Sequence, residues 1–218
     1  MALVLRRSAR ARRITLRVSQ LDGRVTLTLP QHTSPAEAIA FAKSKRDWIM
    51  RNLARQPSFV QVQIGTTLPV EGRECQVQTG SGRAVRFEEG RIFVPGGKPV
   101  AATVRGALKE RARARLATLS DGYSVRLGLP YSRITLRDTR SRWGSCTSDG
   151  GLMYSWRLIL CPPDVMAYVA AHEVAHLAEM NHSPAFWSVV EQLFGPYALQ
   201  RSWLRENGAK LHRFRFED

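Results

Sequence analysis

The sequence is poor in cysteine and has no long hydrophobic run. Its 218 residues include only three cysteines, Cys75, Cys146 and Cys161, too few and too irregularly spaced for a disulfide framework or a paired-cysteine metal site. No apolar stretch approaches the roughly 20 residues of a membrane-spanning helix. The apolar part of the first segment, MALVLRRSARARR, is too short for a secretory signal peptide. These absences argue against secreted and membrane-spanning classes, and we expect a cytoplasmic protein.

Acidic residues are scarce relative to basic ones. The chain has 33 lysines and arginines against 18 aspartates and glutamates, a formal net charge of +15. Seven arginines lie between Arg6 and Arg24 with Asp22 as the only acid among them, and residues 109–115 read KERARAR. This excess is typical of an arginine-rich solvated surface or of a protein that binds a polyanion. Nucleic acid is therefore a candidate partner of the basic N-terminal region, although these clusters hold few aromatic residues that could stack on bases.

One stretch, residues 172–182, has the residue types and spacing of a catalytic metal site. It reads HEVAHLAEMNH. Positions four apart share one face of a helix, so His172 and His176 can direct their imidazole nitrogens at one metal ion. Glu173 can contact a metal-bound water without being a ligand. With His182 as third ligand, the fourth position of a zinc ion stays open, as in catalytic zinc sites. The stretch therefore predicts a zinc hydrolase.

A histidine pair on a solvated helix face is the alternative for this stretch. The surrounding residues argue against it, because Val165 and Val169 fall on the same helical stripe as the two histidines and most other residues between 165 and 177 are apolar. Imidazole and carboxyl groups on a buried helix need a bound partner. The composition of the helix thus favours a metal.

The residues after the motif bear on the third ligand. Asn181 tolerates the left-handed conformation at a helix end, and Ser183-Pro184 has the pattern of an N-cap followed by the first helical residue. His182 then lies at a corner that can fold back. The spacing matches the metzincin pattern, but Glu179 stands where metzincins have a glycine, so we expect the first helix to run further. We favour His182 over the alternative third ligand, Glu191 on the next helix.

Periodicity divides the chain near residue 97. Residues 1–97 predict a β-rich region with one helix, and residues 98–218 predict a catalytic half. The N-terminal region comprises a hairpin over 12–29 that turns at Leu21-Asp22-Gly23, a helix from the capping box at Ser34 to about Arg55, and a strand-rich block over 59–94.

The C-terminal half begins with a basic helix at about 101–119 and a strand at 134–138. A hairpin follows with its turn at Asp149-Gly150-Gly151, then the metal helix from residue 162, a helix over 184–194 and a helix from about 196 that ends at Asn207-Gly208. We therefore expect an α+β protein, with a β-rich N-terminal half packed on a catalytic half whose active-site helix lies against a small antiparallel sheet.

Three C-terminal stretches together resemble a known family. They are SRWGSC at 141–146, YVAAHEVAHLAEMNHSPAFW at 168–187 and YALQRSWLRENG at 197–208. They look like the YgjP-like metallopeptidases, a bacterial zincin family related to SprT-like and WLM proteases. The resemblance implies a minimal zincin fold, zinc on His172, His176 and His182, and Glu173 as the catalytic glutamate. Members of the family are credited with both peptidase and nucleotide pyrophosphatase activity.

Peptide hydrolysis is the favoured reaction, by a zinc-bound water from which Glu173 accepts a proton. The developing oxyanion needs a further donor, for which Arg142, Tyr154 and Tyr197 are candidates. We expect a strand over 150–156 to bind extended substrate at a sheet edge, with Trp143 near the cleft.

Two other functions remain open. A metal-dependent nucleoside triphosphate pyrophosphatase could use the same site, although the sequence has no glycine-rich phosphate loop and no aspartate cluster for magnesium. A zinc-stabilised nucleic-acid-binding protein is the third hypothesis, which the presence of Glu173 disfavours. The sequence does not indicate an oligomeric state.

Overall fold

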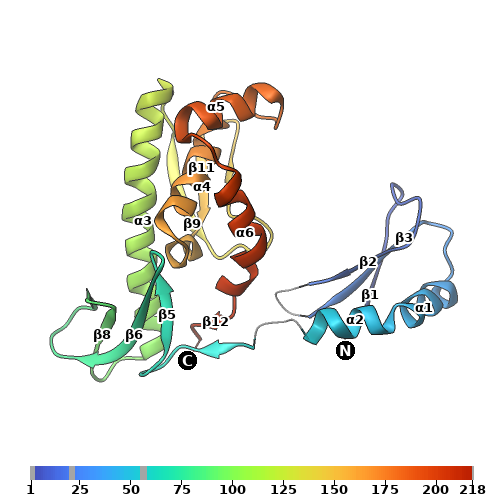
Figure 1. Ribbon diagram of the computed structural model, residues 1–218, viewed down its shortest axis with the longest axis horizontal. Helices are drawn as coiled ribbons and strands as arrows, with labels where there is room; N and C mark the ends of the chain where they lie inside the picture. Colours follow the sequence, from blue (N-terminus) through green and yellow to red (C-terminus); the bar gives the residue numbers. More distant parts are fainter. Residues whose placement is uncertain (1–2, 20–22, 55–57, 218) are drawn as a thin grey trace. The chain divides into compact units, whose positions relative to one another are not determined.

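The computed structural model describes residues 3–19, 23–54 and 58–217. Its contacts divide the chain into two compact units, Met1–Ser58 and Phe59–Asp218, and both contain helices and small sheets, so the protein is α+β as expected (Figure 1). The boundary expected near residue 97 falls inside the second unit. The reason is a shared core, in which Val77 and Ile92 of the strand-rich block are buried together with Val104 and Leu108 of the following helix.

The first unit contains a three-stranded sheet and two helices. In the sheet, β3 (Val25–Leu29) lies between β1 (Leu3–Arg7), which is parallel to it, and β2 (Thr15–Val18), which is antiparallel. The predicted hairpin is therefore confirmed, although Leu21 and Asp22 of its turn lie outside the described residues.

The helix predicted from Ser34 is two helices. The cap is confirmed, since Ser34 Oγ accepts a hydrogen bond from the Glu37 backbone N–H at 3.1 Å. The helix then breaks at Lys45 into α1 (Pro35–Ser44) and α2 (Arg46–Ala54). The two helices cover separate small cores, one with Leu27 and Leu29 under α1 and one with Val18 and Val25 under α2.

The second unit begins with strands. The four strands β5 (Thr67–Val70), β6 (Arg73–Gly80), β7 (Arg86–Glu88) and β8 (Arg91–Pro95) form a sheet in the order β5-β6-β8-β7. Ahead of them, β4 (Val60–Gln61) pairs in parallel with β12 (Phe214–Arg215). The start and the end of this unit are therefore joined by backbone hydrogen bonds, which the sequence did not reveal.

A long helix, α3 (Val100–Leu127), runs along the second unit (Figure 1). It extends beyond the predicted range of 101–119 because its buried positions continue at a spacing of four residues, through Leu108, Ala112 and Leu116, to Ser120 and Ser124. It ends at Gly128, whose φ of 75° is the left-handed conformation of a helix stop.

The three-stranded sheet of the predicted catalytic half has the order β10-β11-β9, formed by β10 (Gly144–Cys146), β11 (Gly151–Ser155) and β9 (Arg133–Arg137). The hairpin of β10 and β11 is confirmed, but β11 is parallel to β9, so the sheet is mixed rather than antiparallel. The prediction of an edge strand over 150–156 is wrong. β11 is the central strand, and β10 is the edge strand that packs against the metal helix.

Three more helices and one short 3-10 helix complete the unit. The 3-10 helix η1 (Trp156–Leu160) leads into α4 (Pro163–Ala175), which lies between α3 and α6 (Ala198–Leu211), and α5 (Pro184–Phe194) packs against α4 (Figure 1). The bounds of α5 match the prediction. Among the described helices, none is both long and apolar enough to cross a membrane.

The predicted helix stop at Asn207-Gly208 is wrong, because α6 continues to Leu211. Gly208 does not end the helix but allows it to pack closely against a neighbouring side chain. A Cβ atom at this position would lie 2.8 Å from Cζ2 of Trp143, so the absence of a side chain lets α6 approach the indole ring. The indole in turn lies 5.4 Å, centroid to centroid, from the ring of His212 at the end of α6.

Candidate metal centre

Helix α4 presents the first two histidines of the motif. It begins at Pro163 and ends at Ala175, so His172 lies in its last turn and His176 is the C-cap. The prediction that this helix extends toward Asn181 is therefore wrong. The chain turns earlier, with backbone hydrogen bonds from Leu177 and Ala178 to the last helical carbonyls. The turn has a function, because it lets Nδ1 of His176 lie 2.9 Å from the carbonyl oxygen of Glu179, which fixes the orientation of the ring.

The corner between α4 and α5 returns the third histidine to the first two. Asn181 Oδ1 accepts a hydrogen bond from the Ser183 backbone, and Ser183 Oγ caps α5 through the Phe186 backbone N–H. As a result, Nε2 of His182 lies 3.1 Å from Nε2 of His172.

The three histidines form a compact set of nitrogen donors. One ring nitrogen from each of His172, His176 and His182 lies within 4.8 Å of the others. Glu191, the alternative third ligand, is exposed on α5 and is outside this group. The structure therefore brings together the three histidines that the sequence motif predicts as metal ligands.

Aromatic residues of α5 hold the three imidazoles in place. The Phe186 ring is completely buried, and its centroid lies 4.9 Å from that of His172, 4.4 Å from that of His176 and 4.8 Å from that of His182. Trp187 contacts His172 and His182 from another side. These contacts limit the rotation of the three rings, and of the three residues His176 is buried and His182 is exposed.

Burial keeps two of the imidazoles, those of His172 and His176, neutral. Burial, together with the neighbouring His176 and His182, lowers the pKa of His172 to about 3, and burial also lowers the pKa of His176. A neutral imidazole has a free lone pair and is the form that binds a metal. Nδ1 of His172 is buried and has no hydrogen-bond partner within the described part of the chain. Three converging nitrogen donors, beside which a buried ring nitrogen of His172 has no partner, fit a zinc-type metal ion.

Glu173 lies next to the histidines and against the edge strand. Its side chain is buried, and it contacts the backbone of β10 at a glycine, because a Cβ atom on Gly144 would be only 2.5 Å from Oε1 and Cγ of Glu173. Burial raises the pKa of this carboxyl to about 8, although the positive charge of Arg142 opposes the shift. A carboxyl group tuned to near neutrality in this way is suited to exchanging protons.

These groups line a cleft with a volume of about 420 Å³. Of the residues predicted to contact substrate, Arg142 and Trp143 line the cleft, but Tyr154 and Tyr197 do not. Tyr154 is fully buried and its hydroxyl pairs with Ser120 Oγ at 3.0 Å, and Tyr197 stacks between Tyr168 and Trp187. The sequence interpretation did not identify further lining residues, although they lie within the three stretches that resemble the family; among them are Ser145, Tyr168, Val169, Met180 and Leu204.

A buried arginine joins several elements of the second unit, and the sequence interpretation missed it too. Arg157 forms a two-pronged ion pair with Asp138, Nε to Oδ1 at 2.7 Å and Nη2 to Oδ2 at 3.1 Å. Its Nη1 also donates to the carbonyl oxygens of Leu211 and Phe214, both at 3.1 Å. It thereby ties η1 to β9 and to the end of α6. The sequence does contain a signal for a buried arginine, because Arg157 is the single charged residue in the otherwise apolar run WRLILC.

Comparisons with known proteins give a family match and a structural similarity. The family described as YgjP-like, metallopeptidase domain, matches residues 12–207. Among solved structures, the chain is similar to the crystal structure of the metallopeptidase zymogen of Pyrococcus abyssi abylysin, with 21% sequence identity and a TM-score of 0.38 over 43% of this chain and 92% of that chain. No curated protein matches the chain.

Proposed function

Because the chain belongs to the YgjP-like metallopeptidase family, we propose that it is a zinc-dependent peptidase with His172, His176 and His182 as metal ligands. One observation carries the proposal. Three imidazole nitrogens that lie within 4.8 Å of one another line the same cleft as a buried glutamate. A metal site that only stabilised the fold would need neither an open cleft nor a proton acceptor beside it.

The donor set favours zinc. Three imidazoles with a position open to the cleft are the ligands of many catalytic zinc sites, whereas magnesium and calcium prefer oxygen donors. A bound zinc ion would supply a Lewis acid and would lower the pKa of a water molecule in contact with it toward 7.

Glu173 is the proton carrier in this proposal. Its carboxylate takes a proton from the attacking water as the water oxygen bonds to the peptide carbonyl carbon. It then delivers that proton to the amine nitrogen as the carbon–nitrogen bond breaks. A metal cation next to the carboxyl would offset the effect of burial and favour the ionised form that accepts the first proton. Gly144 positions the group, because it leaves room for the carboxylate against β10.

Arg142 is the remaining candidate for the donor to the developing oxyanion. It lines the cleft, and its charge acts on Glu173, whereas the hydroxyl of Tyr154 is buried against Ser120 and Tyr197 lies outside the cleft lining. A guanidinium can stabilise negative charge that appears on the carbonyl oxygen in the transition state. We assign this role to Arg142.

The edge strand β10 is the candidate docking site for the substrate backbone. An extended peptide can add a strand to an exposed sheet edge and gain main-chain hydrogen bonds. β10 pairs with β11 on one side only, and Gly144, Ser145 and Cys146 line the cleft. This strand therefore takes the role that the sequence interpretation gave to residues 150–156.

A comparison of the wild type with Glu173→Gln tests the proposal. Both proteins are loaded with zinc, their zinc content is measured, and each is incubated with an unfolded casein-like protein and with a panel of nucleoside triphosphates. The wild type should cleave the protein, and Glu173→Gln should be slower by at least about 100-fold at equal zinc content. Glu173-dependent release of pyrophosphate without peptide cleavage would instead support the nucleotide pyrophosphatase hypothesis.

A further inference from the structure

The outer face of the three-stranded sheet carries a basic groove. This groove has a volume of about 280 Å³, and we refer to it as the arginine groove. Its lining includes Arg133, Arg137 and Arg142, together with the hydroxyl groups of Thr135 and Ser145. Of the described residues that line it, none is acidic and none is aromatic.

Strand register explains why these side chains share one face. Thr135 on β9, Met153 on β11 and Ser145 on β10 are direct neighbours across the sheet, and alternate residues of a strand point to the same side. Arg133 and Arg137 lie two positions before and after Thr135, so they occupy the same face. The arginines therefore mark the two ends of β9, and the hydroxyl groups lie between them.

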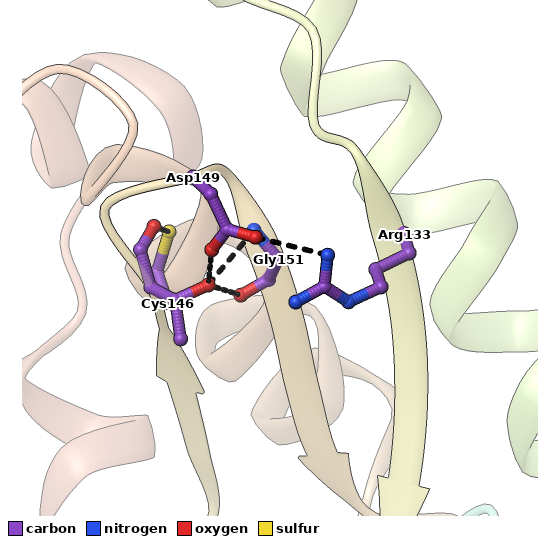
Figure 2. Close-up of polar contacts among 5 residues, drawn as sticks. Arg133, Cys146, Asp149 and Gly151 are labelled. Carbon is purple, nitrogen blue, oxygen red and sulfur yellow. Dashed lines mark hydrogen bonds and ion pairs between the residues drawn. The ribbon is translucent and has the colours of Figure 1, made fainter.

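The charge at one end of the groove is already neutralised. Figure 2 shows Arg133 directed at the turn between β10 and β11, where its Nη1 lies 2.9 Å from Oδ2 of Asp149. The turn itself is held by Thr147, whose hydroxyl donates to Asp149 and accepts from the Gly151 backbone N–H at 3.1 Å. Gly151 permits this packing, because a Cβ atom there would lie 2.8 Å from Oγ1 of Thr147.

The other end of the groove keeps its charge. Arg137 and Arg142 are both exposed, and neither makes an ion pair with any residue in the described ranges. Arg137 is aligned with Ser155 at the last pair of the β9–β11 ladder, the end at which the backbone of Ser155 bonds to Trp143. The unpaired positive charge therefore lies at the end of the sheet where β9 and β11 finish and β10 begins.

The groove and the cleft adjoin each other, since Arg142 and Ser145 line both. A peptide that pairs with β10 would project alternate side chains over the outer face of the sheet. We propose that the arginine groove is a specificity subsite that binds acidic side chains of the substrate polypeptide near the scissile bond, an inference that rests on the proposed peptidase function.

The chemistry of the groove favours an acidic polypeptide over nucleic acid. A nucleic-acid strand is bound by a track of cations along its phosphates and by aromatic rings under its bases. The groove offers two unpaired arginines, adjacent hydroxyl donors and no ring among its described lining residues. Arginine and hydroxyl groups together fit a carboxylate, which accepts several hydrogen bonds at once.

A matched set of peptides tests the inference. Each peptide carries one aspartate at a different position around a common cleavage site, and a partner peptide carries asparagine at that position. With the zinc-loaded wild type, at least one aspartate position should raise kcat/KM about fivefold over asparagine, mainly through KM, and added salt should reduce the ratio. Arg137→Gln should lower the ratio, and Arg137→Glu should reverse it. Arg113→Glu, an equal charge change at an exposed position of α3, should leave it unchanged.

Binding provides a readout that does not depend on turnover. Fluorescence anisotropy of the best aspartate peptide and its asparagine partner is measured with zinc-loaded Glu173→Gln, with and without Arg137→Glu. Tighter binding of the aspartate peptide that disappears with Arg137→Glu supports the subsite. Equal binding and equal cleavage of the two peptides would overturn it, as would a loss of oligonucleotide binding in Arg137→Glu without any aspartate preference. If no peptide is cleaved but the aspartate preference in binding persists, the failure lies with the proposed function.

Discussion

The two faces of the sheet β9–β11–β10 are built from alternate residues of the same strands, yet they have opposite properties. The inner face contributes Leu152 and Tyr154, which are at most 1% exposed and belong to the main core. The outer face carries the arginine groove, where Arg137 is exposed. Inner residues therefore act through packing and fixed geometry, whereas outer residues act through charge in water. Changes on the inner side should be large and independent of substrate, and changes on the outer side should be small, salt-dependent and specific to the substrate.

The largest effect is expected from removal of a metal ligand. His172→Ala deletes one of three converging nitrogens from the cluster, so we expect loss of bound zinc and a fall in peptide cleavage of at least about 1,000-fold. Zinc per chain, measured by elemental analysis after dialysis, checks this. Glu191→Ala is the matched control and should retain zinc. Loss of zinc in Glu191→Ala as well would show that Glu191 is a ligand.

The next effect concerns stability. Arg157→Met removes the partner of Asp138 and the donor to two backbone carbonyl groups, one at the end of α6 and one in β12. Because the Arg157 side chain is buried and its hydrogen bonds to the two carbonyl groups are buried too, we expect a loss of about 3 kcal/mol in the free energy of unfolding. Urea denaturation measures it. Arg113→Met on the exposed surface of α3 should change the free energy by less than about 0.5 kcal/mol. Equal losses in the two variants would mean that Arg157 does not stabilise this region.

Gly144→Ala tests the inner side of the edge strand. The added methyl group would overlap the carboxyl group of Glu173, so the carboxyl must shift, and we expect kcat to fall by about 100-fold while zinc binding is kept. Steady-state kinetics at equal zinc content are the measurement. Gly106→Ala is the control, because a Cβ atom there meets no other atom within 4 Å. Unchanged kcat in Gly144→Ala would refute the positioning role of this glycine.

A smaller effect depends on pH. Burial, assisted by the charge of Arg157, lowers the pKa of His212 to about 4, below the ordinary value of about 6.5 in the unfolded chain. The unfolded state then binds more protons between these values, so the stabilisation is present above about pH 6.5 and is lost as the pH falls toward 4. Going from about pH 7.5 to about pH 5, the wild type should lose about 2 kcal/mol more than His212→Asn. Parallel pH profiles of the two proteins would contradict this.

The basic N-terminal region offers the smallest expected effect on catalysis. We propose, on its charge alone, that the arginines between residues 6 and 24 bind nucleic acid. Charge reversal at three exposed residues, Arg10, Arg12 and Arg13, should weaken salt-dependent oligonucleotide binding and change kcat/KM for a short peptide by less than about twofold. Unchanged oligonucleotide binding would show that these arginines form a solvated surface and do not bind nucleic acid.

Local signals in the sequence predicted the parts of the molecule that depend on neighbouring residues. The cap at Ser34, the hairpin of β10 and β11 and the bounds of α5 follow from turn chemistry and helix capping within a few residues. The histidine cluster could be predicted for the same reason. His172 and His176 are one helical turn apart, and Ser183-Pro184 indicates the corner that returns His182 to them.

Features that depend on residues far apart in the chain could not be predicted in this way. The parallel pairing of β11 with β9, the pairing of β4 with β12 and the bonds from Arg157 to the end of α6 are all long-range. Gly208 shows the difference clearly. Asn207-Gly208 has the local pattern of a helix stop, but contact with Trp143, 65 residues earlier, decides its role.

The most direct test of the central claim, that three histidines and Glu173 form a zinc centre for peptide hydrolysis, is a zinc titration of the metal-free protein during peptide cleavage. The account predicts no activity without metal and a linear rise that ends at one zinc per chain in the wild type, with the same binding stoichiometry but almost no activity in Glu173→Gln. Full cleavage by the metal-free protein, or equal activity in the two zinc-loaded proteins, would contradict it.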